Sequence, residues 1–283
     1  MENPEATRVP YNDIYDPAVA LTFFKSAGTE EKVARGKRFF AENDKTGGLF
    51  SKGAKMYYLA DGEVELTVGK KSIGAIGKGQ VFGEMASISQ SPRSATATAK
   101  TDCSVISLDD KQFQRAIAQA PEFALMLMSI VINRIRQIVA AVSDASLTPD
   151  DKSPGNRSVF DRKLLADLRR EFDGHAPVYA PINKVIIKEG DAGVFMYVVL
   201  EGRVAIHIKD NLVEKVGPGG VIGEMALVDQ SPRIATAIAE ADTSMLAINR
   251  RDFLTFVTTK PDFSVSLLKS LADRLRFMNT QLR

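Results

Sequence analysis

Short runs of alternating apolar and polar residues, rich in Val and Ile, recur through residues 185–248. Turn pairs such as Glu201-Gly202 and Asp210-Asn211 separate the runs, as they do in chains of short strands. The strands predicted from this pattern are Val185–Lys188, Met196–Leu200, Val204–Ile208, Leu212–Val216, Ala235–Ala239 and Ser244–Ile248. Short strands joined by turns at this spacing predict a jelly roll or a small barrel.

Helical patterns flank the predicted strands. In Ser158–Phe172 and Asp252–Leu282, Leu and Phe recur at helical spacing, with charged residues on the other face. A further short helix is predicted to begin at residues 223–226, Gly-Glu-Met-Ala, which follow a Gly-rich turn. The order helix, strands, helix predicts a domain of the α+β class.

The chain contains this pattern twice. Residues 81–99 match residues 221–239 at a constant offset of 140, with 13 identities in 19 positions. Upstream, residues 39–44 resemble residues 186–191 at an offset of 147. The first copy therefore carries seven additional residues around 46–55. An internal repeat of this length indicates two domains of the same fold.

The segment between the two copies has the composition of a linker. It contains Pro149, Pro154 and several Asp and Ser residues, and it lacks an apolar period. We predict a first domain over residues 1–145, a linker over 146–157 and a second domain over 158–283.

Composition narrows the classes of partner and site. The net charge of +2 gives no overall field for binding nucleic acid or an anionic membrane. The single Cys103 and the two separated residues His175 and His207 do not make a zinc site, so we expect no bound metal. Polar residues interrupt the apolar stretch Phe123–Val142, which argues against a membrane span. The expectation is a cytoplasmic protein with no membrane partner.

The most specific signal lies in the repeated segment. Residues 83–86 and 223–226 both read Gly-Glu-Met-Ala, and Arg93 and Arg233 follow seven residues later, each after Gln-Ser-Pro. These segments resemble the phosphate-binding cassette of the cyclic nucleotide-binding domains found in catabolite activator proteins, protein kinase A regulatory subunits and cyclic nucleotide-gated channels. The resemblance covers nearly the whole chain, twice. It implies two tandem domains, each an eight-stranded β jelly roll flanked by helices.

The chemistry of these residues fits such a ligand. A cyclic phosphate is a compact monoanion, and a helix N-terminus offers it free N–H groups and a positive dipole end. Arg93 adds a planar cationic fork that matches two phosphate oxygens. Gly83 allows the backbone to approach the sugar. A carboxylate repels phosphate, so Glu84 makes sense as an acceptor for a ribose 2′-hydroxyl.

The resemblance places a binding site in each copy, with backbone N–H groups of Ala86 and Ala226 on the phosphate. The predicted ligand-binding residues are Gly83, Glu84, Met85, Ala86, Arg93, Ser94 and Ala95 in the first copy, and Gly223, Glu224, Met225, Ala226, Arg233, Ile234 and Ala235 in the second. Ser94 is compatible with cyclic AMP and with cyclic GMP. Ile234 departs from the small residue usual at this position. The alternative is that each Glu and Arg is a solvated surface residue.

A heptad pattern follows each set of strands and has two interpretations. The apolar positions are Met128, Val131, Ile135, Ile138 and Val142 in the first copy, and Leu268, Leu271, Leu275, Met278 and Leu282 in the second. Each helix could pack on its own barrel. Alternatively, Met128, Val131 and Ile135 pair with Leu268, Leu271 and Leu275 in a pseudo-dimer within one chain or in a homodimer. By resemblance to catabolite activator proteins, Ile138, Val139, Met278 and Asn279 would lie near the purine, where Asn279 could read a base edge.

These features predict a receptor that is not an enzyme. No nucleophile motif or phosphate loop is present, and nothing after Arg283 supplies a helix-turn-helix, so direct DNA binding is not expected. The leading hypothesis is a receptor for cyclic AMP or cyclic GMP, with no other cofactor, that rearranges its helices and signals to a protein effector. The alternatives are an interaction scaffold without ligand, and a transcriptional regulator that contacts DNA through another surface or chain.

Overall fold

The structure, a computed structural model, describes residues 15–45, 54–141, 158–172 and 176–281. The predicted linker and His175 lie outside these residues. The chain separates into two compact units, residues 1–126 and 127–283, and each is described by itself. The boundary falls inside the long helix α4 (Pro121–Ala141), so most of this helix belongs to the second unit.

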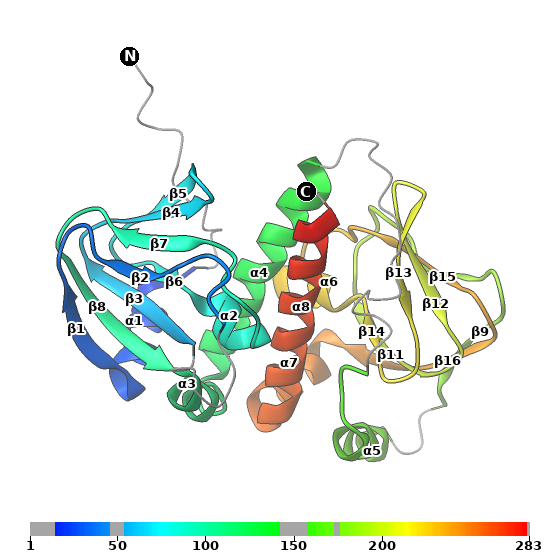
Figure 1. Ribbon diagram of the computed structural model, residues 1–283. Coiled ribbons are helices and arrows are strands. Elements are labelled where there is room, and N and C mark those ends of the chain that lie inside the picture. The colour runs from blue at the N-terminus through cyan, green and yellow to red at the C-terminus, as the bar shows by residue number, and fades with distance from the viewer. Residues whose placement is uncertain (1–14, 46–53, 142–157, 173–175, 282–283) are drawn as a thin grey trace. The chain divides into compact units, whose positions relative to one another are not determined.

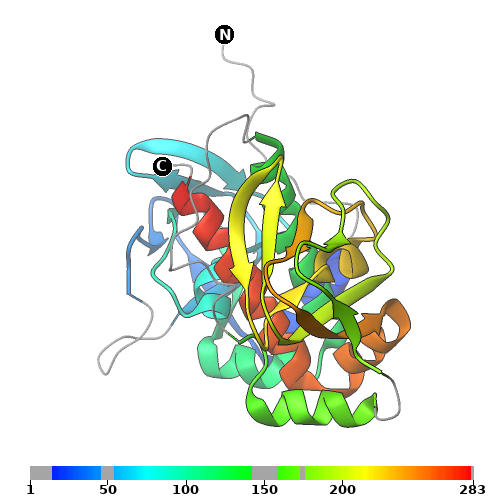
Figure 2. The same cartoon turned by 90° about the vertical axis from the view of Figure 1, so that its right-hand side faces the viewer.

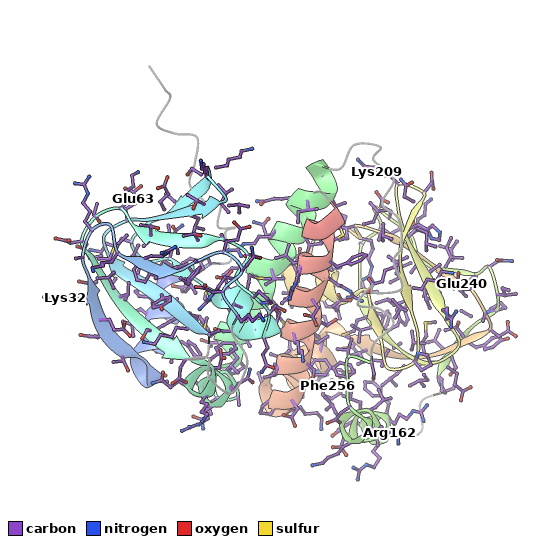
Figure 3. All side chains as sticks on the ribbon, viewed as in Figure 1. Lys32, Glu63, Arg162, Lys209, Glu240 and Phe256 are labelled. Atoms are coloured by element: carbon purple, nitrogen blue, oxygen red, sulfur yellow. The ribbon has the colours of Figure 1, made fainter. Side chains whose placement is uncertain are left out.

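The first unit is a jelly roll with helices (Figure 1). Its strands form two four-stranded antiparallel sheets, in the orders β1-β8-β3-β6 and β2-β7-β4-β5. The strands are β1 (Thr29–Val33), β2 (Arg38–Phe40), β3 (Lys55–Asp61), β4 (Val64–Val68), β5 (Lys71–Ile76), β6 (Val81–Phe82), β7 (Thr96–Ala99) and β8 (Cys103–Asp109). The helices before α4 are α1 (Pro17–Ala27), α2 (Glu84–Ser89) and α3 (Asp110–Ile117). Lys32 extends outward from the edge strand β1 (Figure 3).

The second unit repeats this architecture. Its sheets have the orders β14-β11-β16-β9 and β10-β15-β12-β13. The strands are β9 (Val178–Ala180), β10 (Val185–Ile187), β11 (Phe195–Glu201), β12 (Val204–Ile208), β13 (Asn211–Val216), β14 (Val221–Ile222), β15 (Thr236–Ala239) and β16 (Thr243–Asn249). Its helices after α4 are α5 (Arg162–Glu171), α6 (Glu224–Asp229), α7 (Arg250–Thr259) and α8 (Pro261–Gln281). Helix α8 passes beside the β12–β13 hairpin (Figure 2), where Arg274 contacts Glu214.

The structure confirms the predicted fold of eight strands and flanking helices in each unit and corrects some details. All six strands predicted in the second copy are present, but the short strands β9 and β14 were missed. The helix predicted over residues 252–282 is two helices, because Pro261 has no N–H to continue a helix and instead begins α8. Helix α5 begins later than predicted, where the Asp161 carboxylate caps the amide of Leu164 at 2.7 Å.

Different side chains fill the cores of the two jelly rolls. In the first unit, Phe39, Tyr57 and Phe82 make a cluster of rings whose centroids lie 5.0–5.1 Å apart. In the second unit, Ile186 and Ile222 stand at the positions of Phe39 and Phe82, and Tyr197 keeps the ring of Tyr57. The helices of that unit carry a further ring cluster, in which Phe256 of α7 (labelled in Figure 3) lies 5.5 Å from Phe263 and 5.9 Å from Phe172.

The predicted helical seams consist largely of buried residues. Met128, Val131 and Ile135 are buried in α4, as are Leu268, Leu271 and Leu275 in α8, whereas Val142 and Leu282 lie outside the described residues. The pairing of the two helices stays a prediction.

The length and composition of α4 match those of a membrane span more closely than its polar interruptions suggested. Residues 121–140 reach a mean hydropathy of 1.5. However, 61% of this stretch is buried inside the protein, as in the core helix of a folded domain. Burial, rather than the interrupting charges, is therefore the argument against a span.

Candidate functional site

Each repeated segment begins at a position whose backbone conformation and close neighbours favour glycine. Gly83 and Gly223 precede α2 and α6 in the left-handed backbone region, with φ of 76° and 80°. A Cβ on Gly83 would lie 3.0 Å from Nη1 of Arg93, and one on Gly223 would lie 2.5 Å from Nη1 of Arg233. The glycine therefore permits the turn and leaves room for the guanidinium at the start of the short helix.

The two predicted arginines are held in the same way. Nη1 of Arg93 donates to the carbonyl of Gly83 at 2.7 Å, and its Nη2 donates to the carbonyl of Lys55 at 2.6 Å. In the second unit, Nη1 of Arg233 donates to Gly223 at 2.6 Å and Nη2 donates to Phe195 at 2.5 Å. These bonds use two of the five N–H groups of each guanidinium, so each fork keeps donors for an anion.

The backbone of each arginine is also fixed. In the second unit, the amide of Arg233 donates to the carbonyl of Asp191 at 2.9 Å, and the Arg233 carbonyl accepts from Gly190 at 2.9 Å. In the first unit, Arg93 makes the same pair of bonds with Asp44 and Asn43. These partners lie in the two segments related by the offset of 147. The repeat therefore keeps the backbone hydrogen bonds that hold each arginine as well as the arginine itself.

Both arginines are buried, which excludes the interpretation that they are surface charges. Arg93 is 6% exposed and Arg233 is 9% exposed. Burial lowers the pKa of each guanidinium, and nearby acidic groups, including Glu84 and Glu224, oppose that shift. Each arginine nevertheless stays charged at neutral pH. The ring of Phe40 covers the Arg93 guanidinium, with 4.1 Å from Cζ to the ring centroid.

The two predicted carboxylates are buried as well, with Glu84 4% exposed and Glu224 2% exposed. Oε1 of Glu224 accepts a hydrogen bond from Nη1 of Arg274 on α8. Nε of Arg274 contacts Glu214 on β13 at 3.2–3.3 Å, and its Nη2 donates to the carbonyl of Val221 at 2.8 Å. Burial alone would lower the pKa of Arg274, but attraction to Glu214 and Glu224 outweighs burial and raises it.

One cavity in the second unit contains every predicted ligand-binding residue of that copy except Asn279. Its lining includes Gly223, Glu224, Met225, Ala226, Arg233, Ile234 and Ala235. The remaining wall is mostly aliphatic and includes Ile187 and Ile208 from the strands. Met278 of α8 also lines it, whereas the side chain of Asn279 lies outside the described residues.

The structure brings together part of the predicted set in the first unit. Gly83 is the N-cap of α2, residues 84–86 lie in its first turn, and the Arg93 side chain donates to the Gly83 carbonyl. Ala95, two residues after Arg93, is buried, whereas Ser94 is exposed. The predicted positions of Ile138 and Val139 near the purine stay a prediction.

Sequence reasoning missed several residues that shape the second cavity. Arg274 and Glu214 form its buried ion pairs, and Arg136 of α4 lines its wall. Gly193 packs against Arg233 so closely that a Cβ there would lie 2.6 Å from Cζ of the arginine. A charged residue between the apolar positions of α8 was the available signal for Arg274, but it also fits an exposed helix face.

The comparisons with known proteins identify a family for both sequence copies. The model of the cyclic nucleotide-binding domain family matches residues 30–120 and 177–260. A cGMP-dependent protein kinase of Plasmodium berghei is 27% identical over 71% of this chain and 21% of the relative. A cAMP-dependent protein kinase regulatory subunit of Eremothecium gossypii is 26% identical over 79% of this chain and 43% of the relative.

A cyclic AMP receptor protein of Thermus thermophilus is 36% identical over 36% of this chain and 50% of the relative. The chain thus spans at most half the length of these relatives. The family model, in contrast, covers more than half of the chain in two separate stretches. The chain therefore belongs to the cyclic nucleotide-binding domain family and carries this domain twice.

Proposed function

We propose that the protein is a receptor that binds one cyclic nucleotide in each domain and transmits the binding to a protein partner in the cytoplasm. The observation that carries this proposal is the duplicated arginine fork. Arg93 and Arg233 are buried, and each is held by two carbonyls at equivalent positions. Burying and fixing a cation twice is costly unless an anion uses it.

The roles of the other groups follow from their positions. The N-terminal turns of α2 and α6 offer backbone N–H groups beside the guanidinium, as a ring phosphate requires. In the second domain, Oε1 of Glu224 accepts from Arg274, and in this proposal Oε2 accepts from the ribose hydroxyl. In this proposal, Arg274 holds Glu224 in place and neutralises its charge beside the phosphate.

Both adenine and guanine are candidates for the base. Relatives named for cyclic AMP and for cyclic GMP both match the chain. The wall of the second cavity is mostly aliphatic, so apolar contact with either purine would supply the affinity of the base. Ligand-induced movement of the helices that line this cavity would carry the signal.

Calorimetric titration of the full chain with cyclic AMP and cyclic GMP tests the proposal. We expect two binding sites in the wild type, loss of one site in Arg93→Leu, loss of the other in Arg233→Leu, and no binding in the double variant. The exposed Arg203 supplies the control Arg203→Leu, which should retain both sites.

Because each arginine also satisfies two backbone carbonyls, thermal melts must show that the variants fold. Arg93→Lys and Arg233→Lys keep the charge but lose the fork, and should bind more weakly than the wild type without losing the fold. Folded wild-type protein that gives no heat with either nucleotide at about 1 mM, a concentration that detects even weak sites, would contradict the proposal. That result would favour the scaffold without ligand.

A further inference from the structure

An ion pair in the second unit ties α4 to the end of α6. Nε of Arg136 lies 2.6 Å from Oδ2 of Asp229, and Nη2 lies 3.1 Å from Oδ1, a bidentate arrangement. The side chains of Arg136 and Asp229 are 21% and 7% exposed, so the pair is largely shielded from water. Nη1 of Arg136 also donates to the carbonyl of Pro232 at 2.9 Å.

These contacts hold both ends of the turn that leads to Arg233. Asp229 ends α6, and its Oδ1 also accepts from the amide of Ser231 at 3.1 Å. Gln230 follows in the left-handed region with φ of 54°, an uncommon conformation for this residue type. Pro232 directly precedes Arg233. Arg136 therefore contacts both the start and the end of this turn, and the buried Arg233 directly follows it.

Arg136 also belongs to the wall of the second cavity, together with Ile135. Both residues come from the helix that follows the first sequence copy. The cavity of the second copy is thus completed by a helix from the other copy, within the unit that spans residues 127–283. The repeat alone does not predict this arrangement.

The pair is specific to the second segment. The first copy has Ser89 at the position of Asp229. On α8, Arg276 stands at the position of Arg136, and its side chain is exposed. The Asp229 carboxylate, which the first copy lacks, therefore provides the contact between α4 and the turn that follows α6.

We propose that Arg136 is a positioning residue of the second nucleotide site: by holding the turn of residues 229–232, it fixes Arg233 in the orientation that binds the phosphate. The inference rests on the proposed function. A turn that is already ordered in the free protein loses less conformational freedom when the ligand binds. Affinity at the second site should therefore depend on Arg136, whereas affinity at the first site should not.

The test uses the full chain carrying Arg93→Leu, so that calorimetry with cyclic AMP and cyclic GMP observes only the second site. Arg136→Gln and Asp229→Ser should each weaken binding about tenfold, the change that roughly 1.4 kcal/mol produces. Asp229→Ser introduces the residue found in the first copy, which that fold accommodates. The double variant should bind no more weakly than either single variant, because both remove one interaction.

Three further measurements distinguish positioning from general structural damage. Arg136→Lys should recover part of the affinity, since it keeps the charge near Asp229. Arg276→Gln, the matched control on α8, should leave affinity unchanged. In the chain carrying Arg233→Leu, Arg136→Gln should leave first-site affinity unchanged.

Affinities in Arg136→Gln and Asp229→Ser equal to that of the parent would overturn the inference and leave the proposed function standing. Independent, additive losses in the double variant would also overturn it. Absence of binding in the wild-type chain would overturn the proposed function, and this inference with it.

Discussion

The two nucleotide-binding domains present the same arginine fork within different surroundings. In the first domain, an aromatic ring, Phe40, covers the guanidinium of Arg93. In the second, Ile187 stands at the equivalent position, and its Cδ1 lies 2.9 Å from where a Cβ on Gly223 would be. The duplicated residues thus specify how the cation is presented, whereas the neighbouring wall has diverged from rings to branched chains.

The charges around the two segments have diverged as well. Glu214 and Asp229 of the second copy stand where the first copy has Gly74 and Ser89. Both carboxylates make ion pairs with arginines on long helices, Arg274 and Arg136. These two ion pairs therefore stabilise the second site. The first copy cannot form them, because Gly74 and Ser89 carry no carboxylate. Single substitutions that remove these differences one at a time test which of them affect stability or binding.

Removing Arg274 should have the largest effect. Arg274→Leu would leave Glu214 and Glu224 buried beside each other without the cation that both contact. Breaking a buried pair by removing one partner costs about 3–5 kcal/mol. We expect a loss of that size in the free energy of unfolding, measured by urea denaturation of the ligand-free chain.

The matched control for Arg274→Leu is Arg276→Leu, because Arg276 lies two residues away on the same helix with an exposed side chain. It should change the free energy of unfolding by less than about 0.5 kcal/mol. Equal losses in the two variants would show that the buried ion pairs do not brace the second domain.

A methyl group on Gly193 should disturb the second site by steric contact. The added Cβ would meet Cζ of Arg233 and Cβ of Ala226, both at 2.6 Å. Overpacking of this kind costs about 1–3 kcal/mol. We expect Gly193→Ala to destabilise the second domain by that amount and to abolish nucleotide binding there, as measured by melting and calorimetry. Gly217→Ala, where a Cβ meets nothing within 4 Å, should be neutral.

The contrast between Gly193 and Arg233 shows what the sequence could predict. The repeat and the alternation of apolar residues predicted the fold, and Gly-Glu-Met-Ala with the following arginine pointed to seven of the residues that line the second cavity. These residues are close in sequence, so their spacing carries the information. Gly193 and Glu214 reach the site from other strands or loops, and only the closed barrel brings them near.

Arg274 and Arg136 were beyond sequence reasoning for a related reason. Each lies on a helix among apolar residues, where a charged side chain is usually solvated. Arg274 is buried because Glu214 and Glu224 on other elements neutralise it. Such tertiary compensation has no local pattern, which is why the helices could be predicted and the partners of their arginines could not.

Replacing the ring over Arg93 should make the surroundings of the first arginine resemble those of the second. Phe40→Ile removes the aromatic face that lies 4.1 Å from Cζ and introduces the residue found at the equivalent position 187. A cation over a ring contributes about 0.5–2 kcal/mol, depending on burial. We expect unfolding free energy to fall by about 1–2 kcal/mol in urea denaturation, as lost packing adds to the lost attraction. An unchanged value would show that the ring is only a spacer.

The smallest expected effect concerns a carboxyl that distinguishes the first domain. Asp110 accepts a hydrogen bond from the amide of Ala54 at 3.0 Å, and the second copy has Arg250 at its position. Burial raises the pKa of Asp110 above its ordinary value of 3.8, although the Ala54 amide, Ser87 and the charge of Arg93 oppose the rise. The folded chain therefore holds this proton more tightly than the unfolded chain does.

From that direction of shift, the ionised Asp110 destabilises the fold at neutral pH, and the cost disappears as the pH falls through the raised pKa toward 3.8. Asp110→Asn keeps an oxygen for the Ala54 amide without the charge. We expect the variant to be more stable than the wild type at pH 7, by about 0.5 kcal/mol or less because the site is partly solvated. Urea denaturation at a series of pH values should show this advantage shrinking on acidification; an advantage that is constant with pH would mean that Asp110 does not titrate differently in the folded chain.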